Sequence, residues 1–128
     1  MTAARNTMLV FFGGVAGVSL RWSLIQVFPV SGPWAVYLIN VLGSFLLGCL
    51  YGYSESYTCS WLTTTEGRLL FGTGLLGGFT TYSTFAVDVV QMSEIGSIAG
   101  IIFAGSQLIL GACAALCGLW LGNREKSI

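Results

Sequence analysis

The sequence predicts an all-α integral membrane protein with four transmembrane helices. Of its 128 residues, 55% are hydrophobic and only 8% are charged, whereas a soluble domain carries about a quarter charged residues. The chain therefore lacks the polar side chains that would cover a water-soluble fold. Its mean hydropathy of +0.82 agrees with this, and its 18 glycines against 2 prolines favour apolar helices whose backbones pack closely.

Four apolar stretches divide the chain, each close to the roughly 20 residues that cross a bilayer. They are separated by the turn-rich segment Pro29–Pro33, by the polar segment 54–67 and by Ser93–Glu94. Arg21 and Trp22 stand near the end of the first stretch, where a secretory signal would carry a small-residue cleavage site, so we expect this span to be retained. We predict one membrane domain over residues 1–128, with spans at about 8–27, 34–53, 69–90 and 95–121.

Basic residues are divided unevenly between the two sides of this arrangement. An excess of basic residues marks the cytoplasmic side of a membrane protein. We therefore expect a multi-pass protein of the cell membrane with both termini in the cytoplasm and one fixed orientation. The side of the termini carries Arg5, Arg68, Arg124 and Lys126, and the opposite side carries Arg21 alone.

Small residues recur four positions apart along the apolar stretches. This spacing lets helix backbones approach closely where lipid provides no hydrophobic drive for association. Because four spans bury little surface on their own, we also expect the chain to oligomerise. Examples are Gly13 and Gly17, Gly48 and Gly52, Gly74 and Gly78, and Gly118 and Gly122.

Composition excludes several classes of function. A formal net charge of zero argues against nucleic-acid binding. The absence of histidine removes zinc–histidine sites and the usual general base, so we expect no enzyme. The cysteines form no Cys-x-x-Cys pair and are interpreted as small core residues; they are Cys49, Cys59, Cys113 and Cys117.

Two polar side chains inside the first two spans need partners. Arg21 has two interpretations: its long side chain reaches the membrane interface beside Trp22, or it provides a fixed positive charge that attracts anions. Asn40 must contact another helix or a wet cavity, because an unpartnered amide in hydrocarbon is costly. It serves either as an interhelical hydrogen bond or as a donor to an anion.

The most unusual segment is Gly72–Asp88, within the third span. Its Gly72-x-Gly74-x-x-Gly77 pattern formally matches a dinucleotide fingerprint, but no strand is expected before it. Gly77–Gly78 followed by hydroxyl residues instead predicts a broken helix, which membranes tolerate only where protein or a cavity satisfies the freed backbone groups. Such a break can present carbonyl groups to a cation and N–H groups to an anion.

Beyond the break, Tyr82 and Phe85 share one helix face. An aromatic pair of this kind can simply form a helix contact, but hydroxyl donors surround it, and aromatic rings have positive edges. A neutral, donor-rich wall suits a small anion that binds weakly enough to be released. The surrounding hydroxyl residues are Thr80, Thr81, Ser83 and Thr84.

At these residues the chain resembles the Fluc family of small bacterial fluoride channels. The most specific similarity is Gly77-Gly78-Phe79-Thr80-Thr81-Tyr82-Ser83-Thr84-Phe85, close to that family's Gly-Gly-x-Thr-Thr-Phe-Ser-Thr-Phe signature. Supporting matches are Gly14-x-x-Gly17-x-x-x-Arg21-Trp22 and Asn40-x-x-Gly43-Ser44-Phe45-x-x-Gly48.

The resemblance implies an antiparallel dimer with two narrow pathways that let cytoplasmic fluoride leave passively. It also implies a structural sodium ion at the dimer centre, held by the backbone carbonyl groups of Gly77 and Thr80. Asn40 would donate to the anion. Further residues of the implied fluoride pathway are Arg21 at its vestibule, Thr81, Tyr82, Ser83, Thr84 and Phe85.

The chain departs from the family pattern at several positions. Tyr82 and Asp88 replace a phenylalanine and a glutamate, and Ala35-Val36 replaces a Gly-Thr pair. In the last span, positions expected to carry a polar track are Ala104, Leu108 and Ala112, with only Ser106 and Gln107 polar nearby. This loss, with the uneven basic residues, leads to the hypothesis that the chain is one half of an obligate heterodimer.

Two other functions remain as alternatives. A small multidrug-type, proton-coupled transporter also has four spans, but it needs a carboxylate in the first span, and here Asp88 in the third is the sole candidate. The second alternative is an accessory membrane subunit without a pore, which the glycine-rich packing would also serve.

Overall fold

The computed structural model describes residues 2–27, 30, 32–56 and 60–124, which are almost entirely helical and contain no strand. Three helices are long and apolar enough to cross a membrane: α1 (Ala3–Val27), α2 (Pro33–Ser56) and α6 (Ser97–Arg124). This confirms a helical membrane protein. Pro29 and Ser31 of the expected turn, together with Cys59 and Lys126, lie outside the described residues.

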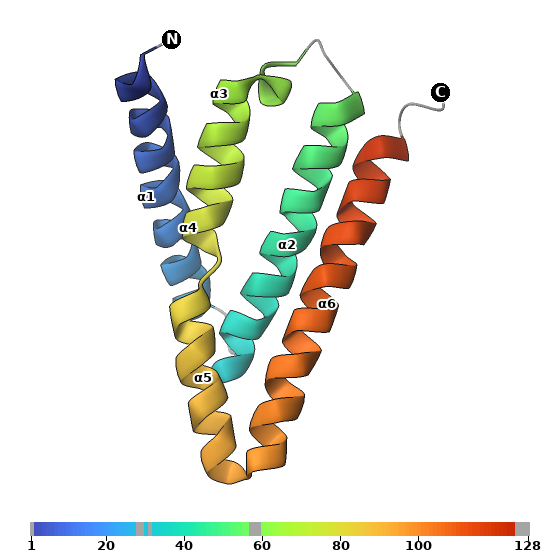
Figure 1. The fold of residues 1–128 in the computed structure, drawn as a ribbon. Coiled ribbons are helices and arrows are strands. Elements are labelled where there is room, and N and C mark those ends of the chain that lie inside the picture. Colours follow the sequence, from blue (N-terminus) through green and yellow to red (C-terminus); the bar gives the residue numbers. More distant parts are fainter. Residues whose placement is uncertain (1, 28–29, 31, 57–59, 125–128) are drawn as a thin grey trace.

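Between α2 and α6 the chain forms a series of shorter helices. A 3-10 turn η1 (Trp61–Thr63) and a short helix α3 (Thr65–Gly67) lead into a π-helix η2 (Arg68–Leu76), then α4 (Gly77–Phe79) and α5 (Tyr82–Ile95). From α3 to α5 they follow one another along one rod beside the three long helices (Figure 1).

The helix break in this rod lies later than the sequence indicated. Gly77 and Gly78 are helical, and the backbone becomes extended at Thr80 and Thr81, with ψ angles of 161° and 125°. The glycines instead serve packing: a side chain on Gly78 would meet the backbone of Gly14 in α1. The expected break at Gly77–Gly78 is thus corrected to Thr80–Thr81.

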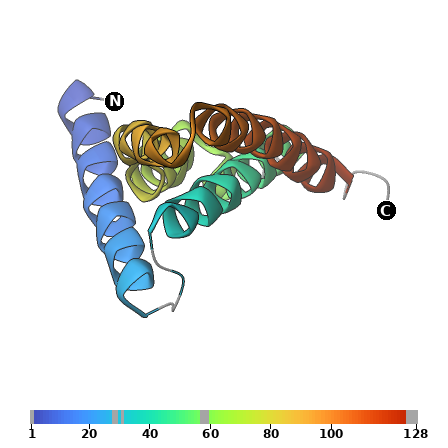
Figure 2. The ribbon, with the colours of Figure 1, turned by 90° about the horizontal axis from the view of Figure 1, so that it is seen from below.

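The helices form two packed groups joined by the broken rod. Helix α1 packs on η2 and α4, whereas α2 packs along α6, and α5 packs on α6. Seen end-on, α1 lies on one side and the α2–α6 pair on the other, with the rod between them (Figure 2). The turn before α6 is at Gly96, so Ser93 and Glu94, expected to break the helix, belong to α5.

Glycines place helix backbones in direct contact in both groups. A Cβ atom on Gly13 or Gly17 of α1 would collide with backbone atoms of η2 and α4. On the other side, Gly48 of α2 meets the backbone at Ala115, and Gly118 of α6 meets the backbone at Phe45. The four-residue spacing of small residues therefore does mark the helix contacts, as membrane helices require.

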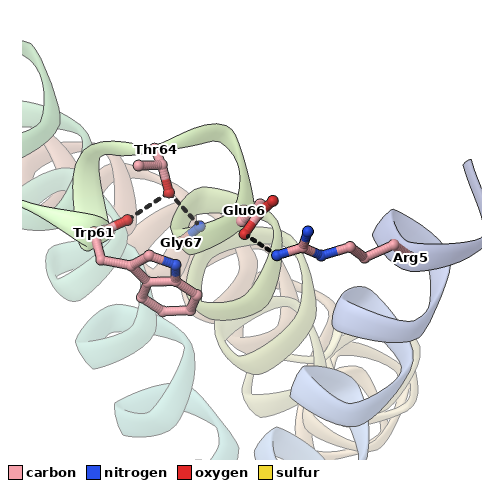
Figure 3. A network of polar contacts seen from close by, with 5 residues as sticks. All are labelled: Arg5, Trp61, Thr64, Glu66 and Gly67. Carbon is pink, nitrogen blue, oxygen red and sulfur yellow. Dashed lines mark hydrogen bonds and ion pairs between the residues drawn. The ribbon is translucent and has the colours of Figure 1, made fainter. Parts of the chain in front are cut away.

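An ion pair fastens the start of α1 to the start of the rod (Figure 3). Arg5 Nη2 donates to Glu66 Oε2 at 2.8 Å. Beside it, Thr64 Oγ1 accepts from the Gly67 N–H at 3.2 Å and donates to the Trp61 carbonyl at 2.6 Å, which caps α3. The ion pair and the cap of α3 lie at the same end of the molecule as the end of α6 (Figure 1).

Gly13→Ala is expected to lower the free energy of unfolding by about 1–3 kcal/mol, because overpacking against backbone cannot be relieved by a side-chain movement. Gly14→Ala is the matched control, since the nearest atom to its Cβ is the Gly74 carbonyl oxygen at 3.9 Å. Unfolding of the purified chain in mixed detergent micelles, followed by tryptophan fluorescence, measures both. Equal stability of the two variants would contradict the packing described.

Candidate functional site

The backbone groups freed at the break are bonded by a side chain from α2. Asn40 Nδ2 donates to the Thr81 carbonyl oxygen at 3.0 Å, and the Thr81 N–H donates to Asn40 Oδ1 at 2.9 Å. Asn40 therefore makes the interhelical hydrogen bonds that its position in an apolar span requires. Because an amide group carries two N–H donors, one remains for a further acceptor.

A second side chain, from α1, reaches the break. Arg21 Nη1 donates to the Thr80 carbonyl oxygen at 3.2 Å, and the arginine is half-buried. The guanidinium group thus contacts the break, while Trp22 beside it is exposed. Three helical segments, α1, α2 and the rod, meet at Thr80 and Thr81.

The break leaves carbonyl groups without their helical donors, among them those of Gly77 and Thr80. In a continuous helix the amides of Thr81 and Thr84 would bond to the carbonyl oxygens of Gly77 and Thr80. The Thr81 amide goes instead to Asn40, and the Thr84 amide goes to Thr81 Oγ1 at 3.3 Å, which caps α5. Carbonyl oxygens in such positions suit hard cations, so the residues expected to hold sodium fit that role.

The first turn of α5 gathers hydroxyl groups and two rings. Thr81 Oγ1 lies 3.2 Å from Ser83 Oγ and donates to Thr84 Oγ1 at 3.3 Å. The rings of Tyr82 and Phe85 have their centroids 6.0 Å apart. Tyr82 is 81% exposed, so the described residues leave its ring largely uncovered.

An open cavity of about 490 Å³ lies between α2, the break and α6. Its lining includes six of the nine expected site residues, whereas Arg21, Ser83 and Thr84 do not line it. All of its lining residues are uncharged. The expected residues in the lining are Asn40, Gly77, Thr80, Thr81, Tyr82 and Phe85, joined by Ser44, Gln107, Leu108 and Ala112 among others.

Gln107 is a site residue that the sequence analysis did not assign. Its side chain is 5% exposed, and neither amide atom has a hydrogen-bond partner among the described residues. It lines the cavity opposite Asn40 because α2 and α6 run side by side. The available signal was the same as for Asn40: a lone amide within an apolar span. Ser106 points elsewhere and accepts from the Tyr37 hydroxyl at 2.9 Å.

Asp88 and the three described cysteines do not line the cavity. Asp88 is buried in α5 with Oδ2 unpartnered among the described groups. Cys49 is half-buried, but Cys113 and Cys117 are exposed on α6. The expectation that all are core residues is wrong for these two, because they occupy the face of α6 that points away from α2.

These features define a helical membrane protein whose broken helix opens on an uncharged cavity rich in hydrogen-bonding groups. The chain belongs to the family described as CrcB-like protein, Camphor Resistance (CrcB), which it matches over residues 8–119. That match covers α2 and the broken rod in full, and most of α1 and α6.

Relatives of similar length are named as fluoride-specific ion channels. The chain is 40% identical to fluoride-specific ion channel FluC 1 of Rhodococcus jostii over 98% of this chain and 92% of the relative. It is 38% identical to fluoride-specific ion channel FluC of Oceanobacillus iheyensis over 97% and 98%. For the FluC protein of Hyphomonas neptunium, identity is 34% over 91% of this chain and 94% of the relative.

Asn40→Ala is expected to destabilise the protein by about 1–2 kcal/mol, because the Thr81 amide and carbonyl would lose their partners inside the membrane. Ser44→Ala is the control: its hydroxyl bonds only to the Asn40 carbonyl within α2. Thermal melting followed by circular dichroism compares the two. A melting temperature for Asn40→Ala equal to that of Ser44→Ala would show that Asn40 does not hold the break.

Proposed function

We propose that this chain is a subunit of a fluoride-selective channel that lets cytoplasmic fluoride leave the cell down its electrochemical gradient. The observation that carries this is the uncharged cavity beside the break, lined by amide, hydroxyl and aromatic groups. An anion held by neutral donors is bound without a counter-charge that would trap it. The relatives named above as fluoride-specific channels support this choice of anion.

Two amide groups are the main candidates for direct contact with the ion. Asn40 has one N–H left after bonding to Thr81, and the buried amide of Gln107 has both N–H donors free among the described residues. The positive ring edges of Tyr82 and Phe85 would add weak attraction. The hydroxyl groups of Ser83 and Thr84 lie on the exposed side of α5, where a second subunit would face them.

The same break would hold a structural sodium ion on the carbonyl oxygens of Gly77 and Thr80. Support comes from the two amides that are directed away from these oxygens. When bound, the ion would supply a fixed positive charge that stabilises the broken helix between the two subunits. Carbonyl ligands without a carboxylate suit a monovalent cation of this kind.

The proposed assembly is an antiparallel dimer of four-span subunits in the cell membrane. In each subunit η2, α4 and α5 would form the third, broken span. Tyr82, 81% exposed, and the open cavity beside it would be covered by the partner. The excess of basic residues on the side of the termini supports a cytoplasmic position for both of them.

We further propose that the partner is a homologous subunit of opposite orientation. A homodimer would need the same chain to insert in both directions, and the basic residues of this chain favour one direction. Leu108 and Ala112 also give the cavity an apolar wall on α6. Gln107 is then the polar residue that α6 contributes to the cavity lining. One of the two pathways would therefore differ from the other.

The ion path is tested by fluoride efflux from liposomes that contain the assembled channel. Phe85→Ile is expected to slow efflux at least tenfold, because an aliphatic chain lacks the positive edge of a ring. Phe11→Ile, on an exposed part of α1 away from the cavity, is the control and should leave the rate unchanged.

Other outcomes of this assay point to other functions. Unchanged fluoride efflux with Phe85→Ile and Asn40→Asp would favour an accessory subunit without a pore. Transport of organic cations driven by a pH gradient and abolished by Asp88→Asn would favour a multidrug-type transporter. The position of Asp88 outside the cavity lining does not support this last function.

The heterodimer is tested by reconstituting the chain alone and with a homologous subunit. Alone, the chain is expected to give less than one-tenth of the efflux rate of the two-subunit preparation, because correctly opposed pairs would be rare. A fluoride electrode measures both rates at matched protein density. The full rate from the chain alone would exclude an obligate heterodimer.

A further inference from the structure

Arg21 occupies an acceptor of the proposed cation site. Its Nη1 donates to the Thr80 carbonyl oxygen at 3.2 Å, and this oxygen is one of the two that would bind sodium. Arg21 is the only cationic side chain that the described contacts bring to the break. The inference that follows rests on the sodium site proposed above.

The position of Arg21 is fixed by the packing of α1. One turn earlier, Gly17 lies directly against the backbone at Leu75 and Phe79. The helical run of η2 and α4 ends at Phe79, so Arg21 lies beside the carbonyl end of that run. A guanidinium group is favourable there, where unpaired carbonyl groups carry partial negative charge.

The guanidinium group and a metal cation would therefore bind to the same partly negative carbonyl oxygen. A carbonyl oxygen has two lone pairs, so both can bind, but they would then be like charges separated by only a few ångströms in a partly buried place. Like charges at such a distance disfavour each other strongly. Arginine stays charged at any pH that the protein meets, so this opposition is permanent.

We propose that Arg21 competes with sodium for the Thr80 carbonyl oxygen and thereby sets the sodium affinity of the break. The guanidinium group donates a hydrogen bond to this oxygen when sodium is absent, and it weakens the binding of sodium when sodium is present. Either Arg21 or sodium then stabilises the break at every sodium concentration. The charge at position 21 determines how much sodium is needed to occupy the site.

Sodium-dependent thermal stability of the purified, assembled two-subunit channel in detergent, with position 21 varied in this chain, tests this, because a bound cation raises the melting temperature by mass action. Sodium is titrated against N-methylglucamine at constant ionic strength. Arg21→Gln is expected to lower the sodium concentration at half-maximal stabilisation at least tenfold. Arg21→Lys, which keeps the charge, should stay within about threefold of the unchanged protein. Arg124→Gln, over the ring of Trp120, is the charge-loss control.

The outcomes separate this inference from the proposed sodium site. Stabilisation by sodium that is equal in all variants, or weaker in Arg21→Gln, would overturn the competition and leave the site standing. A tenfold gain in Arg21→Lys as well would also overturn it, because charge would not be the cause. No effect of sodium on any variant would remove both proposals. Arg21→Met, with an apolar stem of similar length, replaces Arg21→Gln if that variant does not fold.

Discussion

The constraint on which the rest of the structure depends is that backbone interrupted inside a membrane must find hydrogen-bond partners within the protein. At Thr80 and Thr81 those partners are Asn40 from α2 and Arg21 from α1. The arrangement of the helices follows from this requirement. Helices α1 and α2 must lie where Arg21 and Asn40 reach the break, and the glycines of α1 allow a close approach to η2 and α4.

The polar groups at the break serve structure and chemistry together. Asn40 uses one donor and one acceptor to hold Thr81, so its remaining donor has a fixed direction. The carbonyl groups of Gly77 and Thr80, which have lost their helical donors, carry partial negative charge at the same junction, and that of Thr80 accepts from Arg21. The proposed anion site and the proposed cation site would therefore both result from one interruption of one helix, without a charged residue in the cavity wall.

The sequence predicted the helical membrane class and the three long helices because long apolar stretches have few other physical solutions. It misplaced the break, since Gly77 and Gly78 have two uses, interruption and close packing, that look alike in a single chain. The π-helical winding of Arg68–Leu76 has no local signal. Gln107 was passed over because its role depends on the register of α6 against α2, and register is set by contacts between residues far apart in sequence.

The close backbone contact at Gly17 has a consequence for how variation in this chain should be interpreted. Because the backbone of α1 lies in close contact with η2 and α4, turning α1 about its axis would bring side chains into collision with their backbone. The directions of the side chains on α1 therefore depend on glycine positions that carry no side chain. A selection for altered ion tolerance would then be expected to recover substitutions at Gly17 alongside those at Arg21. The glycine would look like a binding residue in such a screen although it touches no ion.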